Sequence, residues 1–229
     1  MKTFCISLGG SIVSGEDGVN VEYIKKLGEM LSKHRKDKRF VIVVGGGYVN
    51  KVYIDAAKKV IKNNSVLDEI GIAFTRINAL FLKDMLSEYL KVYSNIITSI
   101  DELKMVMGNN EISVLGGLLP GITTDSTCVL ACEAVGSKEL INVSRVPYIY
   151  DRPPSEEGAE VLGELNHDKM IELAYKYDSR GARENFIFDL VASKLAKRSN
   201  IKVSFVNDDI DELEKVILGE KHKGSIIIN

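Results

Sequence analysis

Three short apolar runs each end at a cluster of glycines, and this pattern narrows the possible folds more than any other. The glycine clusters are Gly9-Gly10-Ser11, Gly45-Gly46-Gly47 and Gly116-Gly117. Phe40–Val44, which precedes the second cluster, is a continuous β-branched and aromatic run typical of a strand buried on both faces. Because the loops after parallel strands gather at one edge of a sheet, we expect the three clusters to line one crevice.

Amphipathic segments separate the predicted strands. Val21–Lys33 carries apolar residues at helical spacing, and similar patterns predict helices at about 49–61, 72–90, 125–135, 167–177, 186–198 and 211–218. Further strands are predicted at 95–98, 112–115, 140–143, 146–150, 201–206 and 224–228. This alternation indicates an α/β fold, with a mainly parallel sheet flanked by helices on both faces. No long linker interrupts it, so a single domain over 1–229 is expected.

The composition excludes several classes of protein. Hydrophobic residues make up 45% and charged residues 27% of the 229, which is typical of a folded globular chain and not of a disordered one. The formal charge of −2 argues against a nucleic-acid or membrane-surface binder, which needs a basic face. No apolar run approaches the ~20 residues of a membrane span, and the N-terminus lacks a signal-peptide pattern, so we expect a cytoplasmic protein. The odd cysteine count (Cys5, Cys128, Cys132) suits a reducing compartment and buried structural thiols.

Bare glycine loops after strands are suited to binding phosphate. Glycine lets backbone amides approach an anion closely, and a following helix N-terminus adds favourable electrostatics. Each loop alone reads equally well as an ordinary turn, but three in one sheet favour an anion site. The spacing matches neither the dinucleotide fingerprint G-x-G-x-x-G nor the P-loop G-x-x-x-x-G-K-[ST], so both of those enzyme types are disfavoured.

A few charged residues lie near these loops. Lys51 is one helical turn past Gly47, where it could neutralise a phosphate or remain a solvated lysine. Asp68 is expected to precede a helix, as a site residue or as a charge that complements the helix dipole.

Two further acidic positions stand near predicted helix starts. Thr123-Thr124-Asp125 opens a helix, with Thr124 or Asp125 near the N-cap, and capping and ligand binding can coexist there. Asp189 lies within an apolar stretch, which indicates either a local cap or a site. The three histidines occupy polar contexts and are expected at the surface without a role (His34, His167, His222).

In combination these motifs resemble the amino acid kinase family. The matching segments are Ser7-Leu8-Gly9-Gly10-Ser11, Val43-Val44-Gly45-Gly46-Gly47, Leu115-Gly116-Gly117 to Thr123-Thr124-Asp125, and Leu140-Ile141-Asn142 to Tyr150. Three more segments are similar to the uridylate kinases, most of all the archaeal ones: Asp68-Glu69-Ile70-Gly71-Ile72, Thr75-Arg76-Ile77-Asn78-Ala79 and Pro120-Gly121-Ile122-Thr123-Thr124-Asp125. The resemblance covers nearly the whole chain and implies a three-layer sandwich.

The resemblance also implies a reaction, in which the γ-phosphoryl of Mg²⁺-bound ATP passes to UMP, giving UDP for pyrimidine nucleotide biosynthesis. It implies a UMP-binding half near 1–136, an ATP-binding half near 137–229, and a homohexamer built from helix-mediated pairs.

The resemblance assigns roles residue by residue. ATP would be bound by Gly10, Ser11, Gly47, Lys51, Ser144 and Tyr150. UMP would be bound by Gly46, Asp68, Leu118, Leu119, Pro120, Gly121, Ile122, Thr123 and Thr124. The catalytic positions would be Asp125, Asp189 and Lys51, and no residue is assigned as a resident metal ligand. Phosphoryl transfer needs positioning and charge neutralisation more than covalent help.

The chain departs from the family pattern in places. Many members have a lysine at the position of Ser7, and archaeal uridylate kinases resemble this chain in lacking that lysine. Lys51 stands where the family has an arginine. Pro147 and Tyr148 replace an Asp-Gly pair and Pro153 replaces an aspartate, which alters the base end of the expected ATP pocket. Leu190 replaces a proline, a milder change.

Two other functions stay open. One is a different small-molecule kinase of the family, although the histidine expected of an isopentenyl phosphate kinase is absent from Tyr48–Asp55. The other is a non-catalytic ligand- or oxyanion-binding protein on the same scaffold, such as the molybdenum storage proteins.

Overall fold

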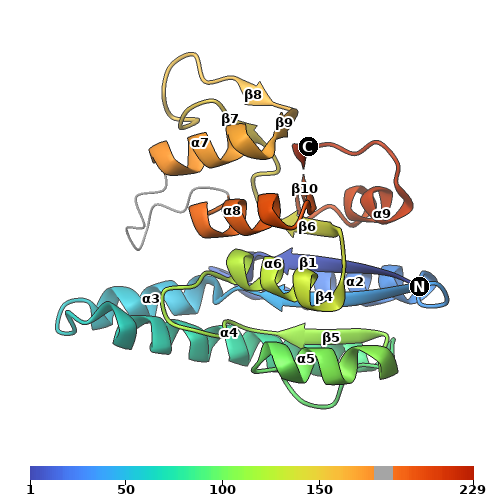
Figure 1. The fold of residues 1–229 in the computed structure, drawn as a ribbon. Coiled ribbons are helices and arrows are strands. Elements are labelled where there is room, and N and C mark those ends of the chain that lie inside the picture. The colour runs from blue at the N-terminus through green and yellow to red at the C-terminus, as the bar shows by residue number, and fades with distance from the viewer. Residues whose placement is uncertain (178–187) are drawn as a thin grey trace.

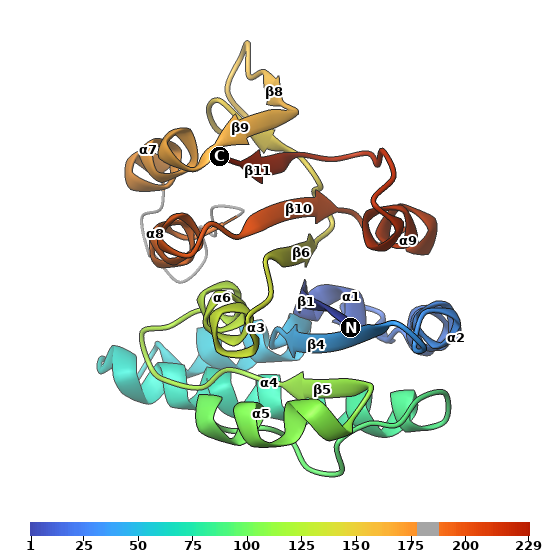
Figure 2. The same ribbon diagram turned by 45° about the vertical axis from the view of Figure 1, so that its right-hand side comes forward.

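A computed structural model describes residues 1–177 and 188–229 of the chain. One seven-stranded sheet runs through the molecule (Figures 1 and 2). In spatial order its strands are β5 (Ile112–Leu115), β4 (Lys38–Val44), β1 (Lys2–Leu8), β6 (Glu139–Val143), β10 (Lys202–Val206), β11 (Ile226–Ile228) and β9 (Glu164–Asn166). All neighbours pair in parallel except β10 and β11, which are antiparallel. The predicted mainly parallel sheet is confirmed.

Helices cover both faces of this sheet, as predicted. One core cluster includes residues from α2 (Val21–Lys33), α4 (Asn64–Ser87) and α9 (Ile210–Leu218). The opposite cluster includes residues from α5 (Ile100–Val106), α6 (Thr124–Val135), α7 (His167–Tyr177) and α8 (Leu190–Arg198). Two further helices begin within the first two glycine clusters: α1 (Gly10–Val13) and α3 (Gly47–Ala57). The result is a three-layer α/β sandwich.

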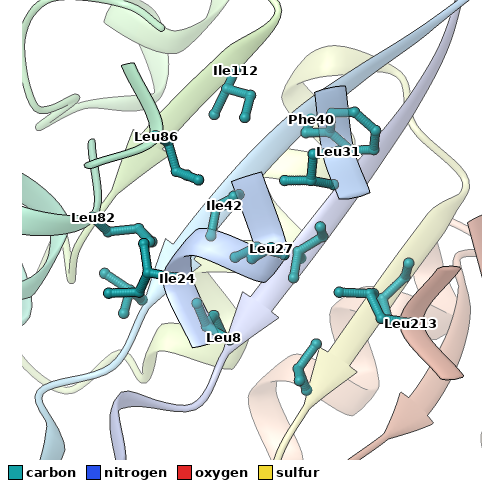
Figure 3. Close-up of a cluster of buried hydrophobic side chains, with 14 of the residues drawn as sticks. Leu8, Ile24, Leu27, Leu31, Phe40, Ile42, Leu82, Leu86, Ile112 and Leu213 are labelled. Carbon is teal, nitrogen blue, oxygen red and sulfur yellow. The ribbon is translucent and has the colours of Figure 1, made fainter. Parts of the chain in front are cut away.

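Alternating residues of the central strands serve the two core clusters. Phe4, Ile6 and Leu8 of β1 belong to the first cluster, where Figure 3 shows side chains of α2 and α4 packed over β1 and β4. Cys5 of the same strand belongs to the second cluster with Cys128 and Cys132 of α6. Strands buried on both faces explain why their sequences read as unbroken apolar runs. The three cysteines are free and buried, as expected.

Helix α4 is longer than its periodicity predicted. It begins at Asn64 instead of residue 72, and the side chain of Asn63 accepts a hydrogen bond from the backbone N–H of Ser65. The expectation that Asp68 precedes a helix is therefore wrong, because Asp68 lies within α4. An N-cap asparagine sets the true start, while exposed polar residues in the first turns blur the apolar pattern.

Two predicted strands shrink in the structure. Residues 95–98 form no strand, and this region contributes only single bridges from Val92 to Ile112 and from Ile97 to Leu115. The strand predicted at 146–150 is reduced to β7 (Ile149–Tyr150), because Pro147 has no N–H for a ladder. The antiparallel hairpins β2 (Ser14–Gly15) with β3 (Gly18–Val19), and β7 with β8 (Val161–Leu162), were not predicted, nor was β9.

Some smaller expectations need correction. Helix α8 begins at Leu190 with Asp189 as its N-cap, and positions 186 and 187 of the predicted helix lie outside the described residues. His167 is buried with 3% of its surface exposed, and desolvation lowers the pKa of its imidazole, so the surface expectation is wrong for this histidine.

None of the helices in the described residues has the length and apolarity needed to cross a membrane.

Candidate active site

The first two glycine loops pack backbone against backbone at the carboxyl edge of the sheet. Strands β1 and β4 end in register at Leu8 and Val44, and the Gly45 N–H donates to Leu8 O at 3.0 Å. A Cβ on Gly10 would lie 2.2 Å from the nitrogen of Gly47 and 2.4 Å from the carbonyl carbon of Gly45. Gly47 also has a φ of +74°, which L side chains rarely adopt. Glycine is therefore required by this close approach as well as by any ligand.

Helix α3 begins at this junction without a side-chain cap. The first amides of an α-helix lack partners within the helix. In α3 the N-cap residue is Gly46, which has no side chain to accept from them. Such a helix end attracts anions. The junction of the two loops is therefore a wall made mainly of backbone, of the kind that can bind an anion.

Helix α4 holds the second and third glycine loops in place. Thr75 Oγ1 accepts a hydrogen bond from the Gly117 N–H at 2.7 Å and donates to Ile72 O at 2.6 Å. Asn78 Nδ2, one turn further on, donates to Gly45 O at 2.8 Å. Sequence reasoning assigned no role to Thr75 or Asn78. The signal that was available is the spacing of two polar residues, i and i+3, on an apolar helix.

The predicted uracil loop, Leu118–Thr124, is fastened to α4 by Asp68. Asp68 Oδ2 accepts a hydrogen bond from the Gly121 N–H at 2.7 Å. Gly121 has a φ of +77°, so the loop turns sharply at the point of attachment. The structure thus brings Asp68 and this loop together, although 53 residues separate the bonded pair.

Asp125 is half-buried beneath the first loop. Its Oδ1 accepts hydrogen bonds from Ser7 Oγ at 2.6 Å and from Asn142 Nδ2 at 2.8 Å. Burial is the largest influence on this carboxyl group and raises its pKa to about 7, the charge of Asp189 adds to the rise, and the two hydrogen bonds oppose it. The sequence departure at Ser7 therefore supplies a hydroxyl donor to Asp125.

Asp189 is the N-cap of α8. Its carboxylate accepts from the backbone N–H groups of Val191 and Ala192 at 2.9 and 3.0 Å. It also accepts from Thr123 Oγ1 at 2.5 Å and from Ser126 Oγ at 2.9 Å. Of the two sequence interpretations, the cap is what the structure contains, and the same carboxylate ties α8 to the start of α6.

The start of α6 differs by one residue from the prediction. Thr123 is the N-cap, and its Oγ1 accepts from the Ser126 N–H at 3.0 Å, whereas Thr124 or Asp125 was expected near the cap. Thr123 Oγ1 thus accepts from α6 and donates to Asp189, which fixes the end of the third loop.

Three predicted site residues make no hydrogen bond to the glycine loops within 1–177 and 188–229. Lys51 is exposed on α3. Ser144 Oγ donates to Val146 O at 2.7 Å, just after β6. Tyr150 is half-buried on β7. The structure therefore brings the glycine loops together with Asp68, Asp125 and Asp189. It shows no such contact for Lys51, Ser144 and Tyr150 within the described residues.

The site combines glycine-loop backbone with two acidic side chains, the half-buried Asp125 and the buried Asp189. In the described parts of the chain, no three His, Cys, Asp or Glu side chains are grouped to hold a metal ion. The four donors on Asp189 leave little capacity for a cation. A divalent cation would therefore need oxygen ligands from a phosphate, as Mg²⁺ usually has in phosphoryl-transfer sites.

The comparisons with known proteins agree with this geometry. A model of the amino acid kinase family matches residues 2–207. A uridylate kinase of Thermoplasma acidophilum is 35% identical over 229 residues, covering 99% of this chain and 96% of the relative. A uridylate kinase of Thermococcus sibiricus is 32% identical, covering 96% of each chain.

Solved structures give the same fold. The crystal structure of uridylate kinase from Archaeoglobus fulgidus superimposes with a TM-score of 0.83 at 28% identity, covering 99% of this chain and 100% of that one. UMP kinase from Bacillus anthracis has a TM-score of 0.80 at 21% identity, covering 99% and 96%, and that likeness shows the fold alone.

Proposed function

This chain belongs to the amino acid kinase family, and on that premise we propose that it is a UMP kinase, which transfers the γ-phosphoryl of ATP to UMP and gives UDP and ADP for pyrimidine nucleotide biosynthesis. One observation carries the proposal: Gly10 and Gly45–Gly47 form a backbone wall, packed so closely that a Cβ on Gly10 would lie 2.2 Å from the nitrogen of Gly47. Phosphoryl transfer is catalysed mainly by positioning and by neutralising charge, and such a wall does both.

The acceptor would bind on the side of β4 and β5. The free amides at the start of α3, Gly46 among them, would hold the UMP phosphate, with Lys51 adding charge from the exposed side of the helix. The 118–124 loop, which the Asp68–Gly121 hydrogen bond fastens, would wrap the uracil. The second Asp68 oxygen would then accept from the ribose.

The donor would bind on the side of β6 and β10, in the half of the chain near 137–229. Gly10, Ser11 and Gly47 would contact the ATP phosphates, and Ser144 and Tyr150 would line the adenosine. This arrangement sets the two phosphates on either side of the junction between the first two loops, where an in-line transfer can occur.

Asp125 and Asp189 would have different roles. Asp189 would act as a positioning residue, because its carboxylate is committed to the starts of α6 and α8. Asp125 Oδ2 makes no hydrogen bond within the described residues, so Asp125 is the carboxylate that could meet Mg²⁺ or its waters. Mg²⁺ bound to ATP would neutralise charge on the transferred phosphoryl group.

A coupled assay of ADP release tests the proposal. UMP should be the preferred acceptor over CMP, AMP and isopentenyl phosphate, because a pocket that hydrogen-bonds a substrate rejects analogues that leave its own groups unpaired. The Cβ added in Gly46→Val would lie 2.2 Å from Asn50 Nδ2 and 2.8 Å from Asn50 Cβ, so the start of α3 would have to shift. We expect the fold to survive this shift and calorimetry to show UMP binding lost.

The outcomes separate the three candidate functions. Turnover of isopentenyl phosphate in place of UMP would identify another kinase of the family. Binding of an oxyanion or nucleotide without any turnover would identify a non-catalytic binder. Equal turnover of UMP and AMP would contradict the assignment of the uracil loop.

We also propose that the protein works as a homo-oligomer, a hexamer by its family resemblance, in the cytoplasm. Helix α3 buries none of its own residues in the single chain. Large apolar side chains are exposed along α3 and α4, namely Val49, Val52, Tyr53, Ile77, Leu80 and Phe81. An exposed apolar surface of this kind supports pairing with a second copy.

A further inference from the structure

Arg145 reaches the first glycine loop from the strand beside it. The residue lies just past the end of β6, whose Val143 O accepts from the Gly9 N–H at 2.9 Å, so the strand end and the loop are joined. Arg145 Nη2 donates to Ser11 O at 3.3 Å. The same nitrogen lies 3.1 Å from the position that a Cβ on Gly15 would occupy. The guanidinium therefore lies at the first loop and the β2–β3 hairpin, although 134 residues separate it from Ser11.

Nothing in the described structure neutralises this guanidinium. Arg152 pairs with Asp151, and Arg198 pairs with Glu133, but no carboxylate in 1–177 or 188–229 forms an ion pair with Arg145. A guanidinium has five N–H donors, and here a single neutral carbonyl accepts one of them. The side chain is exposed, so the remaining donors are available to a ligand.

No other cationic side chain within 1–177 and 188–229 is hydrogen-bonded to the first loop. Within the described residues, Arg145 is the one lysine or arginine whose side chain donates a hydrogen bond to any of the three glycine loops. The hydrogen-bonded pair beneath the first loop is a neutral serine and an aspartate, Ser7 and Asp125. A polyphosphate placed there would need a positive charge nearby. A guanidinium is the side chain best suited to phosphate oxygens, because its donors are planar and can bind two oxygens at once.

We propose that Arg145 binds the phosphates of the donor nucleotide and supplies the fixed positive charge of the first glycine loop. The inference rests on the proposed kinase function, within which it names a donor-binding residue. The donor is favoured over the acceptor because β1 separates Arg145, which follows β6, from β4, β5 and the 118–124 loop on the acceptor side.

Calorimetry with Arg145→Gln tests the inference. Glutamine keeps a donor for Ser11 O but removes the charge. We expect the Mg²⁺ complex of a non-hydrolysable ATP analogue to bind about ten- to a hundred-fold more weakly, the range for one lost charged hydrogen bond. UMP affinity and the melting temperature should not change, and Arg145→Lys should recover part of the loss because it keeps the charge.

Arg39→Gln is the matched control. Arg39 Nη1 also donates to backbone carbonyls, those of Arg35 and Lys38 at 3.1 Å, but at the amino end of β4 and so at the opposite edge of the sheet. This variant should bind the ATP analogue as the parent does. Adenosine, which lacks phosphates, should bind the parent and Arg145→Gln equally.

The outcomes distinguish this inference from the proposed function. Undiminished binding of the ATP analogue by Arg145→Gln overturns the inference. An equal loss of UMP affinity or a large drop in melting temperature also overturns it, because the role would then be structural. If the parent makes no UDP but Arg145→Gln still loses only the ATP analogue, the kinase proposal fails and the phosphate-binding role stands.

Discussion

Single residues in this site have their properties set by what is packed against them. Asp125 looks like an ordinary first-turn aspartate in the sequence, yet desolvation raises the pKa of its carboxyl group to about 7. Gly10 looks like a turn residue, yet it touches the backbone of the neighbouring loop. Both features can be tested by measurements of stability.

Asp125→Asn should change how stability depends on pH. The native pKa of about 7 lies above the ordinary aspartate pKa of 3.8, so between these values the native state binds more protons than the unfolded state. The contribution of the Asp125 carboxyl group to the stability of the parent protein therefore falls as pH rises from about 4 to about 7. Asparagine cannot ionise, and its Oδ1 can accept from Ser7 and Asn142. The melting temperature of the variant minus that of the parent should rise across this window and level off above it.

The control for this measurement is Glu29→Gln, which neutralises an exposed carboxylate on α2. The melting temperature of Glu29→Gln minus that of the parent should show no comparable rise with pH. A constant difference for Asp125→Asn between pH 4 and pH 8 would contradict the raised pKa.

Gly10→Ala should destabilise the fold. The added methyl would lie 2.2 Å from the nitrogen of Gly47, and two backbone segments would have to separate to admit it. We expect a loss of about 3 kcal/mol or more in the free energy of unfolding, the upper part of the range for overpacking. Gly108→Ala is the control, because no atom lies within 4 Å of its added methyl. Urea titrations compare the two, and equal stabilities would refute the close packing of the loops.

At the scale of elements, α4 aligns the glycine loops. Thr75 binds the third loop and Asn78 binds the second, so the spacing of the loops is set by one helical turn. A rigid helix is a better support for a site than a loop is. The phosphate wall should therefore depend on polar side chains that never touch a ligand.

Thr75→Val should weaken this support. Valine keeps the shape but leaves the buried Gly117 N–H, now paired at 2.7 Å, without an acceptor. An unsatisfied buried donor costs about 1–3 kcal/mol, measured as the free energy of unfolding in urea. The KM for UMP should also rise, because the third loop leads into the 118–124 segment. Thr75→Ser retains the hydroxyl and should behave like the parent in both measurements. If Thr75→Val matches Thr75→Ser, α4 does not align the loop in this way.

The segment between β6 and β7 bears on donor choice. Pro147 O accepts from the Ser225 N–H at 3.0 Å, so the segment is anchored to the residues before β11. Proline offers no N–H, and Tyr148 adds bulk where the family has glycine. We predict that kcat/KM for ATP exceeds that for GTP by about tenfold or less, as expected when no buried hydrogen bond reads the base.

Steady-state kinetics of the double variant Pro147→Asp, Tyr148→Gly complete that test. The variant should prefer ATP more strongly than the parent does. A strong preference for ATP in the parent that the double variant leaves unchanged would contradict this role of the segment.

At the scale of the whole molecule, the exposed apolar residues of α3 and α4 predict an assembly. Ile77→Asp places a charge on α4 at a residue that is 59% exposed in the single chain, so a monomer should tolerate it and an apolar interface should not. Light scattering after gel filtration should show a hexamer for the parent and a smaller species for the variant. Met105→Asp, on an α5 residue that is 74% exposed, is the control and should keep the parent mass. A monomeric parent would contradict the assembly.

The amino-acid sequence by itself determined the layers and the glycine loops. Apolar runs such as Phe40–Val44 and amphipathic repeats such as Val21–Lys33 are local patterns, and the structure places β4 and α2 there. Errors arose where local signals were weak, as in the polar first turns of α4, or where pairing was needed, as at 95–98 and β9. A two- or three-residue strand is held by its partner rather than by its own propensity.

Tertiary structure alone decided the contacts that make the site. Ser7 and Asp125 are 118 residues apart, and Arg145 and Ser11 are 134 apart, yet each pair is hydrogen-bonded. These contacts follow from the strand order β5-β4-β1-β6, which places β1 between β4 and β6. Periodicity and capping act over a few residues and do not encode that order, because strand order depends on how whole layers bury their apolar faces together. The glycine loops could therefore be read in the sequence, whereas the raised pKa of Asp125 and the place of Arg145 could not.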